Sequence, residues 1–252
     1  MGIAREVTEG IADVVIDVPP VNALPVDAWF ELADSVTRLG SDPQVRVLVL
    51  RAEGRGFCAG VDIKELAGDP THEALIGVNR GCAAAFAAVY DCAVPVVAAV
   101  HGFCLGGGIG LVGNADIVVA STDATFGLPE VDRGALGAAT HLARLVPQHR
   151  MRAMVYTAEV ATAEELHRYG SVLRVVDPAD LMATAFEVAG TIAAKSATII
   201  RRAKESLNGI DPVDVRRSYR FEQGFTFELS LGSAADEARA AFVGKREAEF
   251  GE

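Results

Sequence analysis

Aromatic residues are scarce in this chain of 252 residues, since Phe, Trp and Tyr together make up 6% of it and Trp occurs once. Long apolar runs are also missing: no stretch approaches the roughly 18 uninterrupted apolar residues that a membrane helix needs. The N-terminus shows no apolar core of a secretory signal. We therefore expect no membrane partner and a cytoplasmic location.

Positive charge is also in short supply, because 23 Lys and Arg face 34 Asp and Glu, for a net charge of −11. Nucleic-acid binders concentrate Lys and Arg on one face, so we expect no nucleic-acid partner. The four cysteines lack the spacing of a zinc site and are expected to be reduced, mostly buried thiols. They are Cys58, Cys82, Cys92 and Cys104. No metal site is predicted.

Strand and helix signals alternate through the first half of the chain, which is 50% hydrophobic overall. This order is typical of βαβ units and predicts an α/β fold with a largely parallel sheet covered by helices. The predicted strands are residues 12–18, 45–50, 94–100, 117–121, 124–127 and 171–176, and the predicted helices of this half are 26–39 and 71–92.

Helical periodicity dominates after residue 137, with long stretches at 179–207 and 214–242. We therefore divide the chain into a core domain, residues 1–190, and a C-terminal helical region, residues 191–252. Helices that cannot all cover one sheet must bury their apolar faces elsewhere, which favours contacts between copies of the chain.

Two glycine-rich segments, residues 54–64 and 101–110, each follow an apolar strand and lead into a helix. Glycine allows close backbone approach, and the first amides of a helix have no acceptor within it. One such segment alone is more often only a tight turn. Two of them in one chain indicate a pair of backbone N–H groups converging on one oxygen.

Five short motifs carry a resemblance to a known family. In their order and spacing, the chain resembles the crotonase (enoyl-CoA hydratase/isomerase) superfamily from about residue 14 to residue 246. Within it, the chain is most similar to a branch, often labelled enoyl-CoA hydratase, that resembles CoA-thioester hydrolases opening steroid-derived rings. The motifs are Asn-Ala-Leu at 22–24, Gly-Phe-Cys-Ala-Gly-Val-Asp-Ile-Lys-Glu at 56–65, Gly-Phe-Cys-Leu-Gly-Gly-Gly at 102–108, Asn-Ala-Asp-Ile at 114–117 and Phe-Gly-Leu-Pro-Glu at 126–130.

The resemblance implies a crotonase (ClpP/crotonase-like) fold of repeated ββα units with a C-terminal helical region that builds trimers. It also implies a homotrimer or a dimer of trimers, and an acyl-CoA substrate, so that coenzyme A enters as part of the substrate and no separate cofactor is expected. By the family's pattern, the backbone amides of Val61 and Gly107 hold the thioester oxygen. Such prepositioned donors stabilise the charge of an enolate.

Carboxylates are fewer than the family's hydratases use, since these hold water between two glutamates that match Gly110 and Glu130 here. An aspartate of isomerases matches Ala138. Glu130 is left as the single carboxylate, and burial is expected to raise its pKa so that it serves as a base. His141 is a candidate to orient or shuttle a proton, although a lone histidine near a helix start is more often a cap or a surface residue.

Coenzyme A carries phosphates that need cations even in an acidic protein. The resemblance points to Lys64 and to the backbone around Ala59 and Ile63, with Asp62 capping the helix that opens at Ile63. It also predicts that two residues reach over from a neighbouring subunit. These are Phe242 and Lys245.

The acyl pocket is expected to be walled by the stretch that begins at Leu66 and ends at residue 79. Gly110, which has no side chain, is expected to leave room beside the thioester for a bulky acyl group. Asp132 and Arg133 are expected to pair with each other on the rim.

Together these residues favour hydrolytic ring opening of a bulky cyclic β-keto acyl-CoA by a retro-Claisen reaction, with Glu130 as the base. One alternative is an enoyl-CoA hydratase or isomerase that uses Glu130 alone. A more remote alternative is a non-catalytic CoA-binding scaffold. The segment 108–113 also matches the dinucleotide fingerprint Gly-x-Gly-x-x-Gly, but the next strand at 117 follows too closely for a crossover helix.

Overall fold

The computed structural model describes residues 2–67 and 71–250. Its main sheet has a first pair of antiparallel strands, and every later neighbour is parallel. In spatial order the strands are β1 (Gly2–Thr8), β2 (Ile11–Asp17), β4 (Val47–Ala52), β6 (Val96–Val100), β8 (Ile117–Ser121) and β11 (Arg174–Val176).

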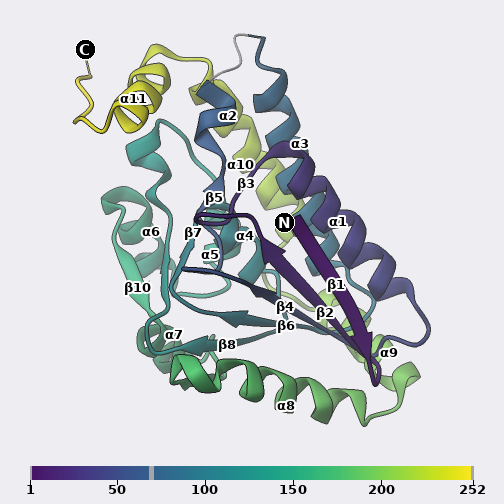
Figure 1. Cartoon of the computed structure of the whole chain (residues 1–252). Coiled ribbons are helices and arrows are strands. Elements are labelled where there is room, and N and C mark those ends of the chain that lie inside the picture. Colours follow the sequence, from purple (N-terminus) through teal and green to yellow (C-terminus); the bar gives the residue numbers. More distant parts are fainter. Residues whose placement is uncertain (1, 68–70, 251–252) are drawn as a thin grey trace.

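Central strands of this sheet are apolar on both faces, as expected for parallel strands covered on both sides. All five residues of β6 are buried, and so are the first four of β4. One face packs against α1 (Val26–Ser41) and α3 (Glu73–Tyr90), whereas the other packs against α8 (Leu181–Ala193). Figure 1 shows α8 running along one side of the sheet and α1 and α3 on the other.

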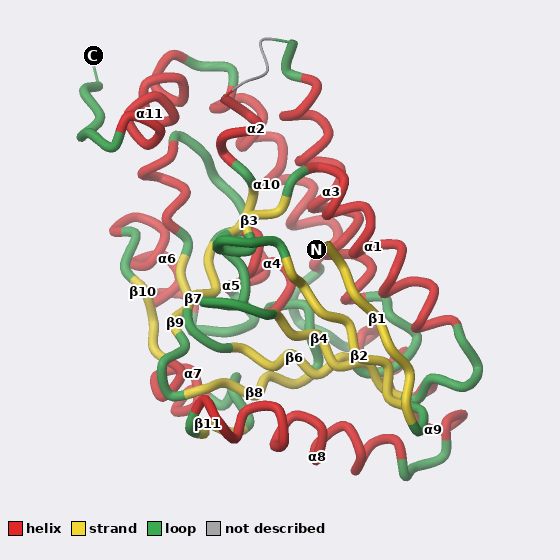
Figure 2. The backbone as a smooth tube through the Cα atoms, viewed as in Figure 1, coloured by secondary structure: helices red, strands yellow, loops and turns green. Residues whose placement is uncertain are grey.

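Three strands of the main sheet are each followed by a short strand and then a short helix, which gives the repeated ββα units of the crotonase fold. The expected fold class is therefore confirmed. The short strands build two small sheets that lie beside one end of the main sheet in Figure 2. The three sets of short strand and short helix are β5 (Gly60–Val61) with α2 (Ile63–Ala67), β7 (Phe103–Leu105) with α4 (Gly107–Val112), and β9 (Thr125–Gly127) with the 3-10 helix η1 (Pro129–Arg133). Two more short strands complete the small sheets: β3 (Ala23–Leu24) pairs with β5, and β10 (Val160–Thr162) pairs with β9.

The second half of the described chain is mostly helical, as predicted, but both long helical stretches are broken. Residues 179–207 contain α8 and most of α9 (Ala197–Gly209), and residues 214–242 contain α10 (Val215–Ser230) and most of α11 (Ser233–Gly244). The remaining elements are α5 (Ala139–Leu142), α6 (Gln148–Thr157), α7 (Ala163–Tyr169) and η2 (Pro178–Asp180).

The C-terminal helices lie against the core. Helix α10 contacts α3 and α5, whereas α11 contacts α2 and η1, so α11 lies over two of the short helices of the ββα units. The boundary expected at residue 190 falls inside α8, which continues to Ala193. All four cysteines are unpaired and buried, as expected. Among the described residues, none of the helices has the length and apolarity to cross a membrane.

Candidate active site

A cavity of about 270 Å³ lies beside the two glycine-rich loops. Its walls come from both loops, from α3 and η1, from residues 135–138 and from the C-terminal helices α10 and α11. A larger hollow of about 830 Å³ lies elsewhere, against α9. Its main charged groups already pair with each other, Lys204 with Asp116 and Arg144 with Asp211. The smaller cavity therefore holds the candidate chemistry.

The two loops are joined through their backbones. The Cys58 amide donates to the Phe103 carbonyl at 3.2 Å, and the Leu105 amide donates to the Cys58 carbonyl at 2.8 Å. A Cβ built on Gly60 would lie only 3.2 Å from the Gly107 amide nitrogen. The loops therefore approach each other so closely that a side chain at position 60 would crowd the contact.

Val61 and Gly107, the predicted pair of amide donors, both line this cavity. Gly107 is the first residue of α4, where backbone amides lack an acceptor within the helix. Val61 belongs to β5, which lies in the first glycine-rich loop and pairs with β3. The structure thus brings both predicted positions to one cavity.

Gly106 fixes where the carboxylate of Glu130 lies. Its backbone has φ 56° and ψ −117°, a conformation that side-chain-bearing residues rarely adopt. A Cβ at this position would lie 2.7 Å from Oε1 of Glu130. The Gly106 amide also donates to the Gly127 carbonyl at 3.1 Å. Glu130 therefore lies against the start of α4, beside the residue that precedes Gly107.

The carboxyl group of Glu130 is poorly solvated. Oε2 is buried and has no hydrogen-bond partner among the described residues. Burial raises the pKa of Glu130 to about 8, and the nearby Glu222 adds to the rise, while its own backbone amide and Arg133 oppose it. A carboxyl with this pKa exchanges a proton near neutral pH, as a general acid or base must. The direction of this shift is the one expected from the sequence.

The position of Gly110 corrects one expectation. Gly110 is buried within α4 and does not line the cavity. A Cβ at this position would overlap the ring of Phe86, a residue of α3 that is 2% exposed and does line the cavity. The space left by the missing side chain is filled by an aromatic ring, so Gly110 leaves no additional room for an acyl group.

Ala138 lies in the cavity wall as an apolar, buried residue, so no carboxylate is present at this position. His141 is fully buried but does not line the cavity. Its Nδ1 lies 3.1 Å from Oδ1 of Asn114, and its Nε2 has no partner among the described residues. Burial, aided by Arg144, lowers the pKa of His141 to about 3, so the ring is neutral.

A tyrosine that the sequence did not reveal lies between His141 and the cavity. The ring of Tyr219, on α10, packs against His141 at 4.8 Å and against Phe86 at 5.2 Å between ring centroids. Tyr219 and Phe86 line the cavity and His141 lies behind them. His141 therefore contacts two wall residues instead of the cavity itself.

Most residues predicted to act in the first loop lie at the cavity or at the start of α2, as expected. Asp62 Oδ1 accepts a hydrogen bond from the Lys64 amide at 2.9 Å, which caps α2 as expected. Ala59, Ile63 and Leu66 line the cavity. Leu75, Val78 and Asn79 of α3 also line it, so the predicted wall 66–79 is present, although residues 68–70 lie outside the described part of the chain.

Phe242 lines the cavity of its own chain, which differs from the expected approach from a neighbouring subunit. The guanidinium of Arg133 stacks over its ring at 4.4 Å. Arg133 makes no side-chain ion pair with Asp132, contrary to expectation, because it turns toward α11; it only approaches the Asp132 carbonyl at 3.4 Å. Cation and ring together form one edge of the cavity.

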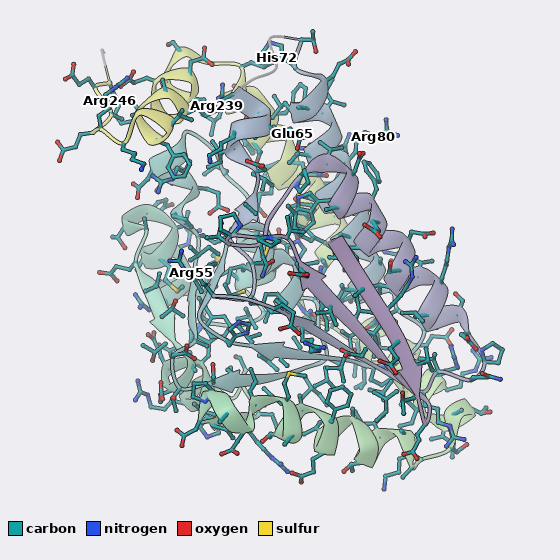
Figure 3. All side chains as sticks on the ribbon, in the orientation of Figure 1. Arg55, Glu65, His72, Arg80, Arg239 and Arg246 are labelled. Carbon is teal, nitrogen blue, oxygen red and sulfur yellow. The ribbon has the colours of Figure 1, made fainter. Side chains whose placement is uncertain are left out.

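The positively charged side chains near the rim of the cavity lie on more than one element of the chain. Arg239 of α11 lines the cavity and bonds to the Ser230 carbonyl and to Asp236. Figure 3 shows Arg239 at the end of the molecule where α11 meets α2. Lys64 and Lys245 are exposed and lie outside the lining, so their predicted role in binding the phosphates of coenzyme A stays a prediction.

Comparison with known proteins assigns the fold and site to a family. The family model described as enoyl-CoA hydratase/isomerase matches residues 6–252. The chain belongs to this family of enzymes. A solved structure described as an enoyl-CoA hydratase from Mycobacterium avium subsp. paratuberculosis K-10 has a TM-score of 0.89 at 23% identity, and the match covers 100% of this chain and 99% of that one. That likeness concerns the fold.

Two curated relatives share one name, (7aS)-7a-methyl-1,5-dioxo-2,3,5,6,7,7a-hexahydro-1H-indene-carboxyl-CoA hydrolase. The relative from Rhodococcus jostii (strain RHA1) is 64% identical over 235 residues, which is 93% of this chain and 91% of that protein. The relative from Mycobacterium tuberculosis (strain ATCC 25618 / H37Rv) is 62% identical over 236 residues, or 94% and 96%. Both names describe a hydrolase that acts on the CoA derivative of a methyl-dioxo-hexahydroindene carboxylic acid.

Proposed function

We propose that this chain hydrolyses a carbon–carbon bond in the ring of a bulky cyclic β-keto acyl-CoA, a retro-Claisen reaction, as part of steroid or lipid catabolism. The observation that carries the proposal is the arrangement around the thioester site. Among the described residues that line the cavity with Val61 and Gly107, Glu130 is the one carboxylate, and the Phe86 ring fills the space beside Gly110. The names of the two hydrolases support this substrate class.

The reaction uses the groups that the cavity provides. Glu130 takes a proton from water, and the hydroxide oxygen bonds to the carbon of a ring ketone. The bond between this carbon and the neighbouring ring carbon, whose negative charge the thioester can delocalise, then breaks. The electron pair of the broken bond forms the thioester enolate. The amides of Val61 and Gly107 hold the enolate oxygen. Glu130 returns the proton to carbon, and the former ketone becomes a carboxylic acid.

The cavity suits the acyl group better than the whole substrate. Small-molecule sites span roughly 300–1,000 Å³, and the cavity of about 270 Å³ lies just below this range. Leu75, Val78 and Phe86 give it an apolar wall that fits a hydrocarbon ring system. The coenzyme A arm would then leave past Ala59 and Ile63, toward the exposed Lys64 and Lys245.

Purified protein tests the proposal directly. We expect it to add one water to the methyl-dioxo-hexahydroindene-carboxyl-CoA named for the relatives, giving an opened ring with a new carboxyl group in mass and NMR spectra. Crotonyl-CoA, which contains no ring, is the comparison substrate. Turnover of crotonyl-CoA in the usual range of roughly 1–10³ s⁻¹ with no ring opening would instead favour the hydratase. Binding of coenzyme A without any turnover would favour the scaffold.

We extend the proposal to a cytoplasmic homotrimer or dimer of trimers, and exposed apolar residues of the C-terminal helices support the assembly. Helix α9 exposes Ile199 at 68% and Leu207 at 60%, and Ile210 follows it at 74%. Apolar side chains that cluster on one surface commonly mark a contact between subunits. Light scattering on a size-exclusion column tests this assembly, and a monomeric mass would contradict it.

A further inference from the structure

Tyr219, in the wall of the cavity, has a hydroxyl group without a hydrogen-bond partner among the described residues. Among those residues, the fully buried polar side-chain atoms without a partner are Glu130 Oε2 and His141 Nε2, so the Tyr219 hydroxyl is not fully buried. Tyr219 lines the cavity, and its hydroxyl is the polar atom that this side chain offers to a bound ligand. A polar group of a pocket wall that is left without a protein partner is the kind of group that orients a ligand.

The ring of Tyr219 is held in place by two neighbours. It packs at 5.2 Å against Phe86 and at 4.8 Å against His141, with interplanar angles of 56° and 53°. His141 is itself fixed by the contact of its Nδ1 with Asn114. The orientation of the phenol is therefore set by packing on two sides, which is what a preorganised donor requires.

Other polar groups of the wall are less suited to meet the acyl group. The hydroxyl of Thr226 donates to the Leu136 carbonyl at 2.7 Å, and Asn79 accepts hydrogen bonds from Gln223. Ser230 lies near the other end of α10, about 16 Å along the helix axis from Tyr219 at about 1.5 Å per residue. The thiol of Cys82 is a weak donor.

We propose that the Tyr219 hydroxyl donates a hydrogen bond to the ring ketone of the substrate and stabilises the alkoxide that forms when water adds to it. The inference rests on the proposed ring opening and adds a second oxyanion site to it. Burial raises the pKa of Tyr219 well above its usual value, with Cys82, Glu222 and Glu130 adding to the rise. The phenol therefore stays protonated and is available as a donor.

The two oxyanion sites act in successive steps. When hydroxide bonds to the ketone carbon, the π electron pair moves to the ketone oxygen, which Tyr219 holds as an alkoxide. The alkoxide then re-forms a carbonyl, the ring carbon–carbon bond breaks, and its electrons pass to the thioester oxygen held by Val61 and Gly107. Tyr219 keeps its own proton throughout. Charge thus moves from one donor site to the other within one cavity.

Tyr219→Phe tests the hydroxyl because it keeps the ring that packs on Phe86 and His141. We expect kcat for ring opening to fall by roughly 10²–10³, as on removal of a single oxyanion donor, with little change in KM. Tyr156→Phe is the matched control, since Tyr156 is 70% exposed on α6 and lines no part of this cavity. The control should retain wild-type kcat.

A half-reaction separates Tyr219 from the rest of the site. In D₂O, the isolated ring-opened thioester should exchange its α-proton through Glu130 and the two amides, a reaction in which no water adds to a ketone and no alkoxide forms. We expect Tyr219→Phe to exchange at the wild-type rate and Glu130→Gln to lose exchange. Wild-type ring opening by Tyr219→Phe, or equal losses in exchange and ring opening, would overturn the inference. Absence of ring opening in the wild type, with exchange intact, would instead overturn the proposed function.

Discussion

The ring of Phe86 occupies the space into which a side chain at position 110 would project. Phe86 is 2% exposed and is enclosed by Trp29, His141 and Tyr219, with ring centroids 4.9 to 5.7 Å away. The absence of a second carboxylate is thus coupled to an aromatic residue on a different helix. Introducing a glutamate at position 110 would require the core around α3 to repack.

This coupling predicts that Gly110→Ala destabilises the protein. The added methyl group overlaps a ring that packs against Trp29, His141 and Tyr219, and such overpacking costs about 1–3 kcal/mol. In a Phe86→Leu background the same substitution should cost less, because the smaller side chain leaves room for the methyl group. Denaturant unfolding of the four proteins in this double-mutant cycle measures the coupling.

Gly190→Ala is the matched control for that cycle. Gly190 lies within α8, and a Cβ built there meets no atom within 4 Å. Alanine in an open helical position should leave stability unchanged or raise it by up to about 1 kcal/mol. Equal costs for Gly110→Ala with and without Phe86 would contradict the coupling.

The sequence predicted the parts of the site that belong to local backbone motifs. Val61 and Gly107 lie within glycine-rich loops that come after apolar strands, and Glu130 follows the short strand β9; the resemblance of these local motifs to the family identified the three positions. Each feature depends on residues close together in the chain, so its place in the fold can be anticipated. The strand predicted at 117–121 coincides with β8 for the same reason, because a continuous apolar run is a local signal.

Residues that depend on packing between distant helices were not predicted. Phe86 lies in an alanine-rich helix and Tyr219 in a C-terminal one, and each pattern indicates only a helix. Their meeting depends on how α10 crosses α3, which periodicity does not encode. Strand β1 was missed because most of its side chains are exposed, and its position is set by pairing with β2.

A pH dependence of ring opening follows from the raised pKa of Glu130, which is about 8. The base must be ionised to accept a proton, so kcat/KM should rise as pH increases through about 8 and then level off. Arg133→Gln should move this limb to higher pH, since the positive charge of Arg133 favours the ionised carboxylate. Rate profiles of both proteins from pH 6 to about 10 check this, and a limb that stays in place would exclude the electrostatic contribution of Arg133.

The same pKa predicts how stability changes with pH. Between the ordinary pKa of 4.5 and about 8, the folded protein retains a proton on Glu130 that the unfolded chain releases. The contribution of Glu130 to the free energy of unfolding therefore falls as pH rises through this window. Glu130→Gln lacks this titration, so its Tm relative to wild type should rise by roughly several degrees from pH 5 to pH 9. A constant difference in Tm would show that Glu130 titrates normally.

His141 predicts the opposite trend at acid pH. Its pKa is about 3 in the folded protein against 6.5 in the unfolded chain, so the unfolded chain gains a proton first as pH falls. Wild-type stability should decline from about pH 6.5 toward pH 3 relative to His141→Gln, a variant whose amide can still donate to Oδ1 of Asn114. Thermal unfolding from pH 7 to about pH 4 measures the difference. Because His141 stays neutral throughout the range in which Glu130 ionises, the limb of kcat/KM near pH 8 should keep its position in this variant, and a displaced limb would mean that the imidazole takes part in the proton transfer.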